Sequence, residues 1–462
     1  MRVELLKWFI TDFRRAKPPA AQPRGYFIHY IALVNLRQSI SFILAVFLLL
    51  SCARQTEKQP DRSTVFIGAT VFDGTGSDPV PNGVVVVRDG RIVSVGPAET
   101  IPIPDGAERI DVSGKWIIPG LINAHGHVGN VKGLEMGHYS AENIQRQLEL
   151  YAKYGITTVV SLGDDGEQAE RFRAVNDTVA GRSFARLYIA GDVVGGATPE
   201  AALEVVDNNV KMGVDFIKIR VDDNLGQSSK MSGDIYSPVI DRAHTHGLKL
   251  AAHMYYLADA KDLLRSGADF IAHSVRDTSV DDEFISLLKE KQVCYCPTLT
   301  RDLSTFVYET RPDFFDDPFF LKEADTAVIR MLESPERQAQ IKNSVSAQTY
   351  KRSLETALSN LKILADNGVT IAFGTDSGMP ARFQGYFEHI EMEMMADAGM
   401  TPAQVLLSAT RDAARCLDLD GVGTLEPGKW ADLVVLDADP LQDVRNCRSI
   451  HGVWIGGRQV GH

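Results

Sequence analysis

The chain has 462 residues, 44% of them hydrophobic and 23% charged, which is typical of a globular protein and allows a large core. The formal net charge of −12, without dense basic clusters, argues against nucleic acid or an anionic lipid surface as the partner. Five scattered cysteines are too few to predict a disulfide framework, and we interpret Cys294-x-Cys296 as small apolar residues in a strand.

The N-terminus has the pattern of an export signal. Residues 40–50, ISFILAVFLLL, form an apolar run that is too short to span a bilayer comfortably. The run leads into LLSC, which resembles the bacterial lipobox, in which the cysteine (here Cys52) becomes the lipidated first residue. An uncleaved membrane anchor or a chance cysteine is the alternative. We expect residues 1–51 to be the export segment and 52–62 a polar tether. The protein would then be a membrane-anchored lipoprotein that faces the periplasm or the cell exterior.

Residues 63–117 alternate short β-rich runs with turns, and the same texture returns in residues 420–462. Asn82-Gly83 and Asp89-Gly90 are both hairpin signals. These two regions flank a segment of different character. We therefore predict one small β-sandwich that is formed from both ends of the chain.

The middle of the chain, residues 118–419, alternates strand-like with helix-like segments. This pattern predicts an α/β fold, specifically a (β/α)₈ barrel of the TIM type. The predicted strands are 118–127, 156–162, 186–191, 214–220, 248–253, 269–274, 292–298 and 369–376. The predicted helices include 200–212, 238–247, 258–266 and 281–290.

A long insertion, residues 299–350, precedes the last predicted strand and contains the acidic and aromatic stretch YETRPDFFDDPFF. Loops that leave the C-terminal ends of barrel strands surround the active site. We therefore favour a lid over the barrel mouth, and a simple surface excursion is the alternative.

Four histidines and one aspartate end apolar runs of the predicted barrel. His125 and His127 lie two residues apart on the first strand, so both imidazoles point to the same side. His253, His273 and Asp376 end three further strands, at the edge where barrel enzymes keep their chemistry. Imidazole and carboxylate ligands suit Zn²⁺ and similar divalent ions. The pattern predicts a site for one or two divalent metal ions.

Other polar groups are interpreted as structural. His244-Thr245-His246 repeats the spacing, but it lies at a predicted helix C-terminus, where side chains two residues apart diverge. Glu388, Glu391 and Glu393 look like the solvated face of a helix.

Lys218 lies in the middle of the apolar run VDFIKIR, where an ammonium group is costly. Alternation places Lys218 and Arg220 on one face, which we expect to point into the barrel. Burial and nearby cations would favour the free amine, and a free amine reacts with CO₂ to give a carbamate that could bridge two metals. A lysine that reaches the barrel mouth, or one paired with Asp222 or Asp376, is the alternative.

Taken together, these motifs resemble the amidohydrolase superfamily, specifically the imidazolonepropionase-like metal-dependent hydrolases that include Xaa-Pro dipeptidases. The resemblance covers about residues 63–460 and rests on PGLINAHGH, DFIKI, AAH, FIAHS, FGTDSG and the closing TPAQVLLSAT and GTLEPGKWADLVVLDADP. It implies the following site residues: His125, His127 and Asp376 for the more buried metal, His253 and His273 for the second, and a carboxylated Lys218 as the bridge.

The resemblance implies hydrolysis of an amide-like C–N bond by a metal-activated water, with Asp376 as general base and then general acid. We expect a small-molecule substrate, either a dipeptide or an N-acyl amino acid. A cyclic amide, imidazolone or lactone hydrolase, and a lipoprotein that binds a metal or ligand without catalysis, are the alternatives. Many dipeptidase-like relatives carry Gly-Gly-His after the third strand, whereas this chain reads AGDVVGGATPE. The residues expected at the mouth of the barrel to contact the substrate are Arg220, Tyr255, Tyr256 and Arg276. A homo-oligomer is left open.

Overall fold

The computed structural model describes residues 63–461. The predicted export segment 1–51, the tether 52–62 and the lipidation site Cys52 lie outside the described residues. Within the described range, none of the helices is both long enough and apolar enough to traverse a lipid bilayer.

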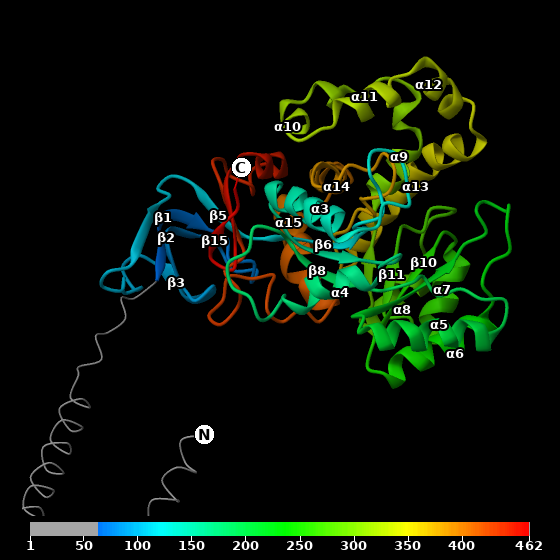
Figure 1. Cartoon of the computed structure of the whole chain (residues 1–462), viewed down its shortest axis with the longest axis horizontal. Helices are drawn as coiled ribbons and strands as arrows, with labels where there is room; N and C mark the ends of the chain where they lie inside the picture. The colour runs from blue at the N-terminus through cyan, green and yellow to red at the C-terminus, as the bar shows by residue number, and fades with distance from the viewer. Residues whose placement is uncertain (1–62, 462) are drawn as a thin grey trace, which may run out of the picture. The chain divides into compact units, whose positions relative to one another are not determined.

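An eight-stranded sheet joins both ends of the described chain, as the adjoining blue and red strands show (Figure 1). Its order is β15-β14-β13-β5-β1-β2-β3, and β4 pairs with β1 beside this path. The strands are β1 Thr64–Val71, β2 Val80–Arg88, β3 Arg91–Pro97, β4 Glu108–Asp111, β5 Trp116–Pro119, β13 Leu433–Leu436, β14 Ile450–Ile455 and β15 Arg458–Gln459. The ends meet where β13 pairs antiparallel with β5.

Strand β2 is buried on both faces, which explains its run of four valines. Val84 and Val86 pack with Val65 on one face, whereas Val85 and Val87 belong to a larger cluster on the other. A strand that is covered on both sides needs no polar alternation.

Only one of the two hairpin signals forms a hairpin. Asp89 and Gly90, with φ of 51° and 77°, connect β2 to β3, as two successive residues with positive φ in a type I′ turn require. The prediction for Asn82-Gly83 was wrong. Asn82 has φ of 47° but lies inside β2, where the pairing with β1 changes register. Its left-handed conformation therefore makes a bulge instead of a turn.

The middle of the chain contains two parallel sheets, β6-β7-β8 and β12-β11-β10-β9. Their strands are β6 Leu121–Gly126, β7 Ile156–Ser161, β8 Arg186–Ile189, β9 Phe216–Val221, β10 Lys249–Met254, β11 Phe270–Ala272 and β12 Cys294–Cys296. Isolated bridges connect the sheets, including Val194 with Ile219 and Gly126 with Ser377.

The predicted last strand, residues 369–376, is not a strand, and the sheets of residues 63–461 form no closed eight-stranded barrel. This segment lies between β12 and β6 and makes only scattered bonds to them, such as the bridge of Ile371 with Tyr295. The backbone then turns: Thr375 and Asp376 both donate to the carbonyl of His125, and Asp376 has φ of 59°. The turn that positions Asp376 thus interrupts the ladder.

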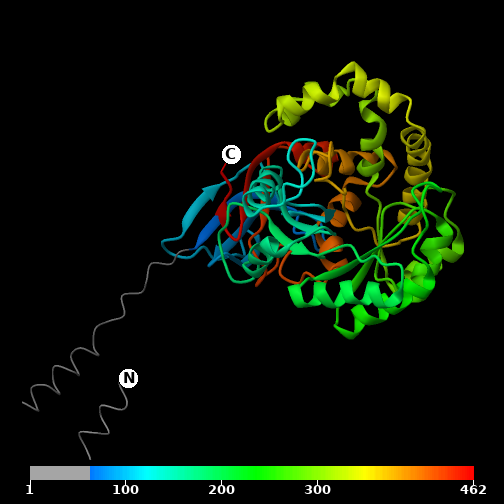
Figure 2. The ribbon, with the colours of Figure 1, turned by 45° about the vertical axis from the view of Figure 1, so that its right-hand side comes forward.

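Helices follow the parallel strands and lie along their outer side (Figure 2). They are α3 Ala141–Lys153, α4 Glu167–Ala174, α5 Pro199–Met212, α6 Gly233–Thr245, α7 Leu257–Ser266 and α8 Asp282–Lys291. Helix α5 shows how local sequence sets the ends: Thr198 accepts a bond from the amide of Ala201, Pro199 begins the first turn, and Gly213 takes the left-handed conformation after the last.

The insertion folds as short helices, drawn in yellow (Figures 1 and 2). Its elements are α9 Leu299–Phe306, η2 Val307–Glu309, η3 Asp313–Asp316, α10 Pro318–Leu321, α11 Thr326–Leu332 and α12 Pro335–Lys342, followed by the long α13 Val345–Asp366. The aromatic residues of YETRPDFFDDPFF form a separate hydrophobic cluster with α14 (Tyr386–Asp397), in which Tyr308, Phe315 and Phe320 are fully buried. The insertion therefore has its own core.

The chain then passes through α15 Pro402–Leu407, a π-helical turn η4 Ser408–Asp412, α16 Ala413–Cys416 and η5 Val444–Arg448. A disulfide joins Cys294 of β12 to Cys416 of α16. The interpretation of Cys294 as a plain strand residue was therefore incomplete. The partner lies 122 residues away, beyond the reach of any local pattern. Cys296 is buried and free.

We expect the double variant Cys294→Ser/Cys416→Ser to lose about 2–5 kcal/mol of unfolding free energy, because a crosslink over so long a loop restricts the unfolded chain. Chemical denaturation measures the loss, and thiol titration of the denatured wild-type protein counts free cysteines. Reductant should lower the melting temperature of the wild-type protein but not that of the variant. A wild-type melting temperature that ignores reductant would contradict the bond.

Candidate metal centre

Four histidines and one aspartate from separate segments meet at the C-terminal ends of the parallel strands. Two of the histidines lie in strands β6 and β10, and the other three side chains follow the ends of β6 and β11 or belong to the segment after α13. They line a cavity of about 190 Å³ together with a buried lysine. These six residues are His125, His127, Lys218, His253, His273 and Asp376.

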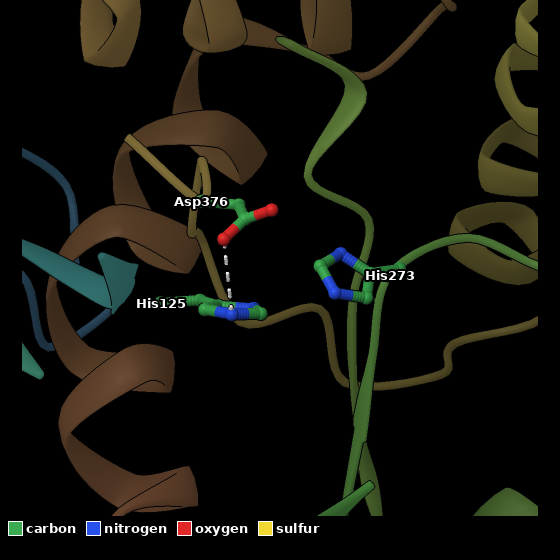
Figure 3. A group of neighbouring side chains, drawn as sticks. All are labelled: His125, His273 and Asp376. Atoms are coloured by element: carbon green, nitrogen blue, oxygen red, sulfur yellow. Dashed lines mark ion pairs between the residues drawn. The ribbon is translucent and has the colours of Figure 1, made fainter. Parts of the chain in front are cut away.

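Asp376 is the common partner of the two histidines of the HxH motif. Its Oδ1 lies 2.8 Å from Nε2 of His127 and 3.5 Å from Nε2 of His125. Potential ligand atoms of His125, His273 and Asp376 all lie within 4.8 Å of one another, and Figure 3 shows their side chains around one space. This spacing allows one ion to contact all three.

The remaining histidines extend the cluster. The ring centroids of His253 and His273 are 4.2 Å apart, and those of His125 and His273 are 4.7 Å apart. The imidazoles thus form a continuous group.

The outer nitrogens of two histidines are held by oxygen acceptors. Nδ1 of His127 lies 3.2 Å from the carbonyl of Gly163, and Nε2 of His253 lies 2.9 Å from Oδ2 of Asp222. An acceptor at one ring nitrogen selects the tautomer that leaves a lone pair on the other. Nδ1 of His253 thereby keeps its lone pair for a metal, whereas Nε2 of His127 faces the carboxylate of Asp376 at 2.8 Å.

The third such partner is a hydroxyl in a strained loop. Nδ1 of His273 lies 2.7 Å from Oγ1 of Thr298. His273, Thr298 and Asp376 have φ of 77°, 46° and 59°, a region that residues with a Cβ rarely adopt. Such strain clusters at functional sites, where the surrounding structure enforces it. The fourth histidine differs from these three. Nδ1 of His125 is buried and has no hydrogen-bond partner among residues 63–461.

The protonation states suit metal binding. Burial lowers the pKa of His125 and His273 well below the usual value and lowers that of His253 to about 3. Burial also opposes protonation of His127, but its hydrogen bond to Asp376 outweighs that effect and raises its pKa. Neutral imidazoles with free lone pairs and an ionised carboxylate are the donors that Zn²⁺ and similar ions prefer. The side chains present therefore fit a divalent metal.

Lys218, on β9, is only 3% exposed, and its Nζ lies 3.3 Å from Nε2 of His125. Burial lowers its pKa to about 8. In the described part of the chain, no carboxylate lies within ion-pair distance of Lys218. The two carboxylates that were its possible partners pair with histidines instead, Asp222 with His253 and Asp376 with His127. The lysine thus neither reaches the barrel mouth nor forms the ion pairs that were its alternatives.

Glu388 was wrongly assigned to a solvated face, since α14 buries it completely. Its Oε1 accepts hydrogen bonds from Asn123 (2.7 Å), Thr375 (2.7 Å) and Ser377 (2.5 Å). Asn123 in turn accepts from the backbone amides of His125 and Thr375. This buried carboxylate connects the two segments that carry His125 and Asp376.

Glu391, three residues further on the same face of α14, is also fully buried, which corrects the same assignment. It accepts hydrogen bonds of 2.7 Å from the amide of Leu299, the amide of Thr300 and the hydroxyl of Thr300. It therefore holds the segment after β12, next to Thr298. Buried apolar residues on this face, including Met392 and Met395, were the available sequence signal.

Of the four residues expected to contact the substrate, only Arg220 lines the metal cavity. Tyr255 and Arg276 are buried, and Arg276 pairs with Asp302 at 3.3 Å beneath the cavity wall. The hydroxyl of Tyr256 donates a hydrogen bond to Asp223 at 3.0 Å, and Tyr256 does not line the cavity. Strand β11 ends at Ala272, and the chain turns at His273. The alternation of side-chain direction along a strand therefore could not predict where the side chain of Arg276 points.

Two further arginines line the cavity, and the sequence offered no signal for either. Arg301 begins the insertion in α9, is bonded to Asp302 at 2.8 Å and stacks on Tyr350. Arg382 contacts the carboxylate of Asp376 and also bonds Ser304 at 3.1 Å. Both come from loops whose course only the folded chain shows.

We expect Glu388→Ala to lower the unfolding free energy by about 3 kcal/mol or more, because three buried donors would lose their acceptor. The same variant should retain less divalent metal, since the segments of His125 and Asp376 lose one of the connections that hold them together. Denaturant titration and elemental analysis measure the two effects. Glu355→Ala, at an exposed position of α13, is the control and should change neither. Wild-type stability and metal content in Glu388→Ala would refute this role.

Comparison with known proteins adds the family. The sequence pattern of the amidohydrolase family matches residues 116–460. A 5-methylthioadenosine/S-adenosylhomocysteine deaminase of Symbiobacterium thermophilum is 26% identical over 437 residues, which cover 81% of this chain and 85% of the relative. The ochratoxinase of Aspergillus niger is 22% identical over 455 residues, 86% of each chain.

Solved structures share the fold. A protein of Bifidobacterium longum assigned as a prolidase has a TM-score of 0.70 and 26% identity, covering 87% of this chain and 95% of its own. A Xaa-Pro dipeptidase with methionine bound in its active site has a TM-score of 0.69 and 22% identity, covering 87% of this chain and all of its own.

Proposed function

Because the chain belongs to the amidohydrolase family, whose members here include hydrolases of C–N bonds, we propose that it hydrolyses the amide bond of dipeptides or N-acyl amino acids. The observation that carries this proposal is the cavity in which imidazoles, a carboxylate and three guanidinium groups face one another. The family relationship supports a metal-dependent hydrolase, and the arginines support a substrate that carries a carboxylate.

His125, His127 and Asp376 would hold one divalent ion, for which we propose Zn²⁺, and His253 and His273 would hold a second. When bound, such an ion supplies Lewis acidity and lowers the pKa of water at the site. Gly163, Asp222 and Thr298 orient three of the imidazoles from behind. This outer layer keeps the donors in place without a change of conformation.

Asp376 is proposed to accept the proton of the attacking water and to deliver it to the leaving nitrogen. Burial by itself would raise the pKa of this carboxyl, but Arg382 and the two histidines of the HxH motif hold it well below the usual range. The group is therefore ionised and able to accept a proton. Its left-handed backbone directs the side chain into the cavity.

Lys218 is proposed to react with CO₂, forming a new N–C bond to give a carbamate and releasing one proton. Its burial, its place beside His125 and its lack of a carboxylate partner in the described chain support this modification. The product is an anion with two oxygens, suited to lie between two cations. A buried cation among metal ligands would thereby be replaced by a ligand.

Arg220 and Arg301 are proposed to bind the substrate carboxylate. A guanidinium group can pair with a carboxylate through two parallel hydrogen bonds. The Arg220 side chain is 45% exposed, bonds Asp222 at 3.2 Å and also donates to Asn224, so a ligand carboxylate would share or replace these acceptors. Arg301 is held more firmly by Asp302 and Tyr350.

Export as a lipoprotein remains a proposal, which the Cys294–Cys416 disulfide supports because such bonds persist in oxidising compartments. The thiol titration of the disulfide also tests this idea. Reduced Cys294 and Cys416 in protein taken directly from its cells would contradict it.

Zn²⁺- or Mn²⁺-loaded protein should release amino acids from a panel of dipeptides and N-acyl amino acids. Asp376→Asn should lower kcat by about a hundredfold or more, since it removes the proton carrier. Turnover of lactones or cyclic amides without peptide cleavage would replace the proposed substrate class. A metal-replete protein that is inactive on the whole panel, with ligand affinity unchanged in Asp376→Asn, would favour a binding lipoprotein.

Lys218→Ala should lose the second metal ion and most activity, with partial rescue by short carboxylic acids that replace the carbamate. Elemental analysis and steady-state rates measure both effects. Lys249→Ala, at the start of the neighbouring strand β10 and outside the cavity, is the control and should keep both. Full metal content and rate in Lys218→Ala would refute the carbamate.

A further inference from the structure

A second cavity adjoins the metal centre. It has a volume of about 260 Å³, and two of its lining residues, Met379 and Arg382, also line the metal cavity. The two cavities therefore share a boundary at these side chains. We call this second cavity the insertion pocket, because helices α10 and α11 and the turn between them supply one of its walls.

The insertion pocket is apolar inside and charged at its rim. Its inner walls include Leu150 of α3, Phe320 of α10, Val328 of α11 and Phe383. Lys132, Arg146, Glu323 and Asp325 surround this apolar surface. Ligand sites combine such apolar walls with a few polar groups, and drug-sized ligands occupy about 300–1,000 Å³. The insertion pocket is thus large enough for one substituent but small for a separate ligand.

The wall from the insertion is held in place by direct contacts to the rest of the molecule. Lys153 pairs with Glu323 at 2.7 Å, Tyr386 donates to Asp317 at 2.8 Å, and Tyr154 donates to the carbonyl of Phe319 at 3.1 Å. Phe320 is fully buried in the aromatic cluster of the insertion. The pocket is therefore formed before a ligand binds, which reduces the entropy lost on binding.

We propose that the insertion pocket binds the acyl side of the substrate, so that the enzyme prefers amides with a bulky apolar acyl group. This inference rests on the proposed function. The amide lies at the metal centre, the carboxylate contacts arginines that line only the metal cavity, and the apolar acyl group passes Met379 into the insertion pocket. Removing apolar surface from water in this pocket favours binding of such a group.

The apolar character also explains the role of the insertion. An insertion that served only as a lid to exclude water would not need an apolar surface on the side that faces the cavity. Here the insertion supplies Phe320, Ala324 and Val328 to a cavity that shares Met379 and Arg382 with the metal cavity. It therefore acts as a specificity element, and the acidic residues of YETRPDFFDDPFF serve its folding through pairs such as Asp317 with Arg448 at 2.7 Å.

Ala324→Trp tests the assignment, because Ala324 is half-buried and its side chain borders the pocket. We expect kcat/KM for N-phenylacetyl and N-octanoyl amino acids to fall about tenfold or more, the size of effect that one steric change in an apolar pocket produces. The N-acetyl derivative of the same amino acid should change less than about twofold. Ala327→Trp, exposed on α11 and outside the pocket, is the matched control and should affect neither substrate.

Val328→Ala provides the opposite change, since it enlarges the pocket and should shift the preference toward longer acyl chains. Equal losses for short and long acyl groups in Ala324→Trp, or no loss for either, would overturn the proposal. Calorimetric binding of phenylacetate separates this inference from the proposed function, because it needs no turnover. Binding to the wild-type protein and to Ala327→Trp but not to Ala324→Trp supports the pocket even if N-acyl amino acids are not hydrolysed. Equal binding to all three, or none to the wild-type protein, refutes it.

Discussion

The buried carboxylate of Glu388 is the interaction on which the metal centre depends. It accepts hydrogen bonds from Asn123, two residues before His125, and from Thr375 and Ser377, which flank Asp376. A carboxylate without partners would be strongly unfavourable in the core, so the three donors are what make its burial tolerable. The same three bonds join segments about 250 residues apart, since Asn123 and Thr375 are separated by 252 positions.

Burial has a second consequence at the ligands themselves. The apolar surroundings disfavour imidazolium, so His125, His253 and His273 present lone pairs instead of protons. The acceptors behind the rings decide which nitrogen carries that lone pair, and Lys218 is the one cation that this environment leaves without a carboxylate partner in the described chain. The burial that keeps the imidazoles neutral therefore also lowers the pKa of Lys218.

Two other parts of the molecule, the sheet built from both chain ends and the insertion, support the site without supplying any of these metal ligands. The C-terminal strand β13 pairs with β5, and β5 leads directly into β6 and His125, so the chain ends anchor the first ligand strand. The insertion instead lines the two cavities, through Arg301 and the walls of the insertion pocket. The geometry of the metal ligands thus rests on regular strands and a buried network, whereas the proposed selectivity rests on an insertion with its own core.

The sequence by itself indicated the alternation of strands and helices, the approximate bounds of α5, α7 and α8, and the residues that gather at the centre. These features follow local rules: strand periodicity places His125 and His127 together, and caps such as Thr198 and Gly213 end α5. Tertiary structure alone decided the Cys294–Cys416 bond, the burial of Glu388 and Glu391, the irregular segment around Asp376, and the entry of Arg301 and Arg382 into the cavity. Each of these depends on which distant segment of the chain packs against a residue. A local pattern of charge or hydrophobicity does not identify that segment.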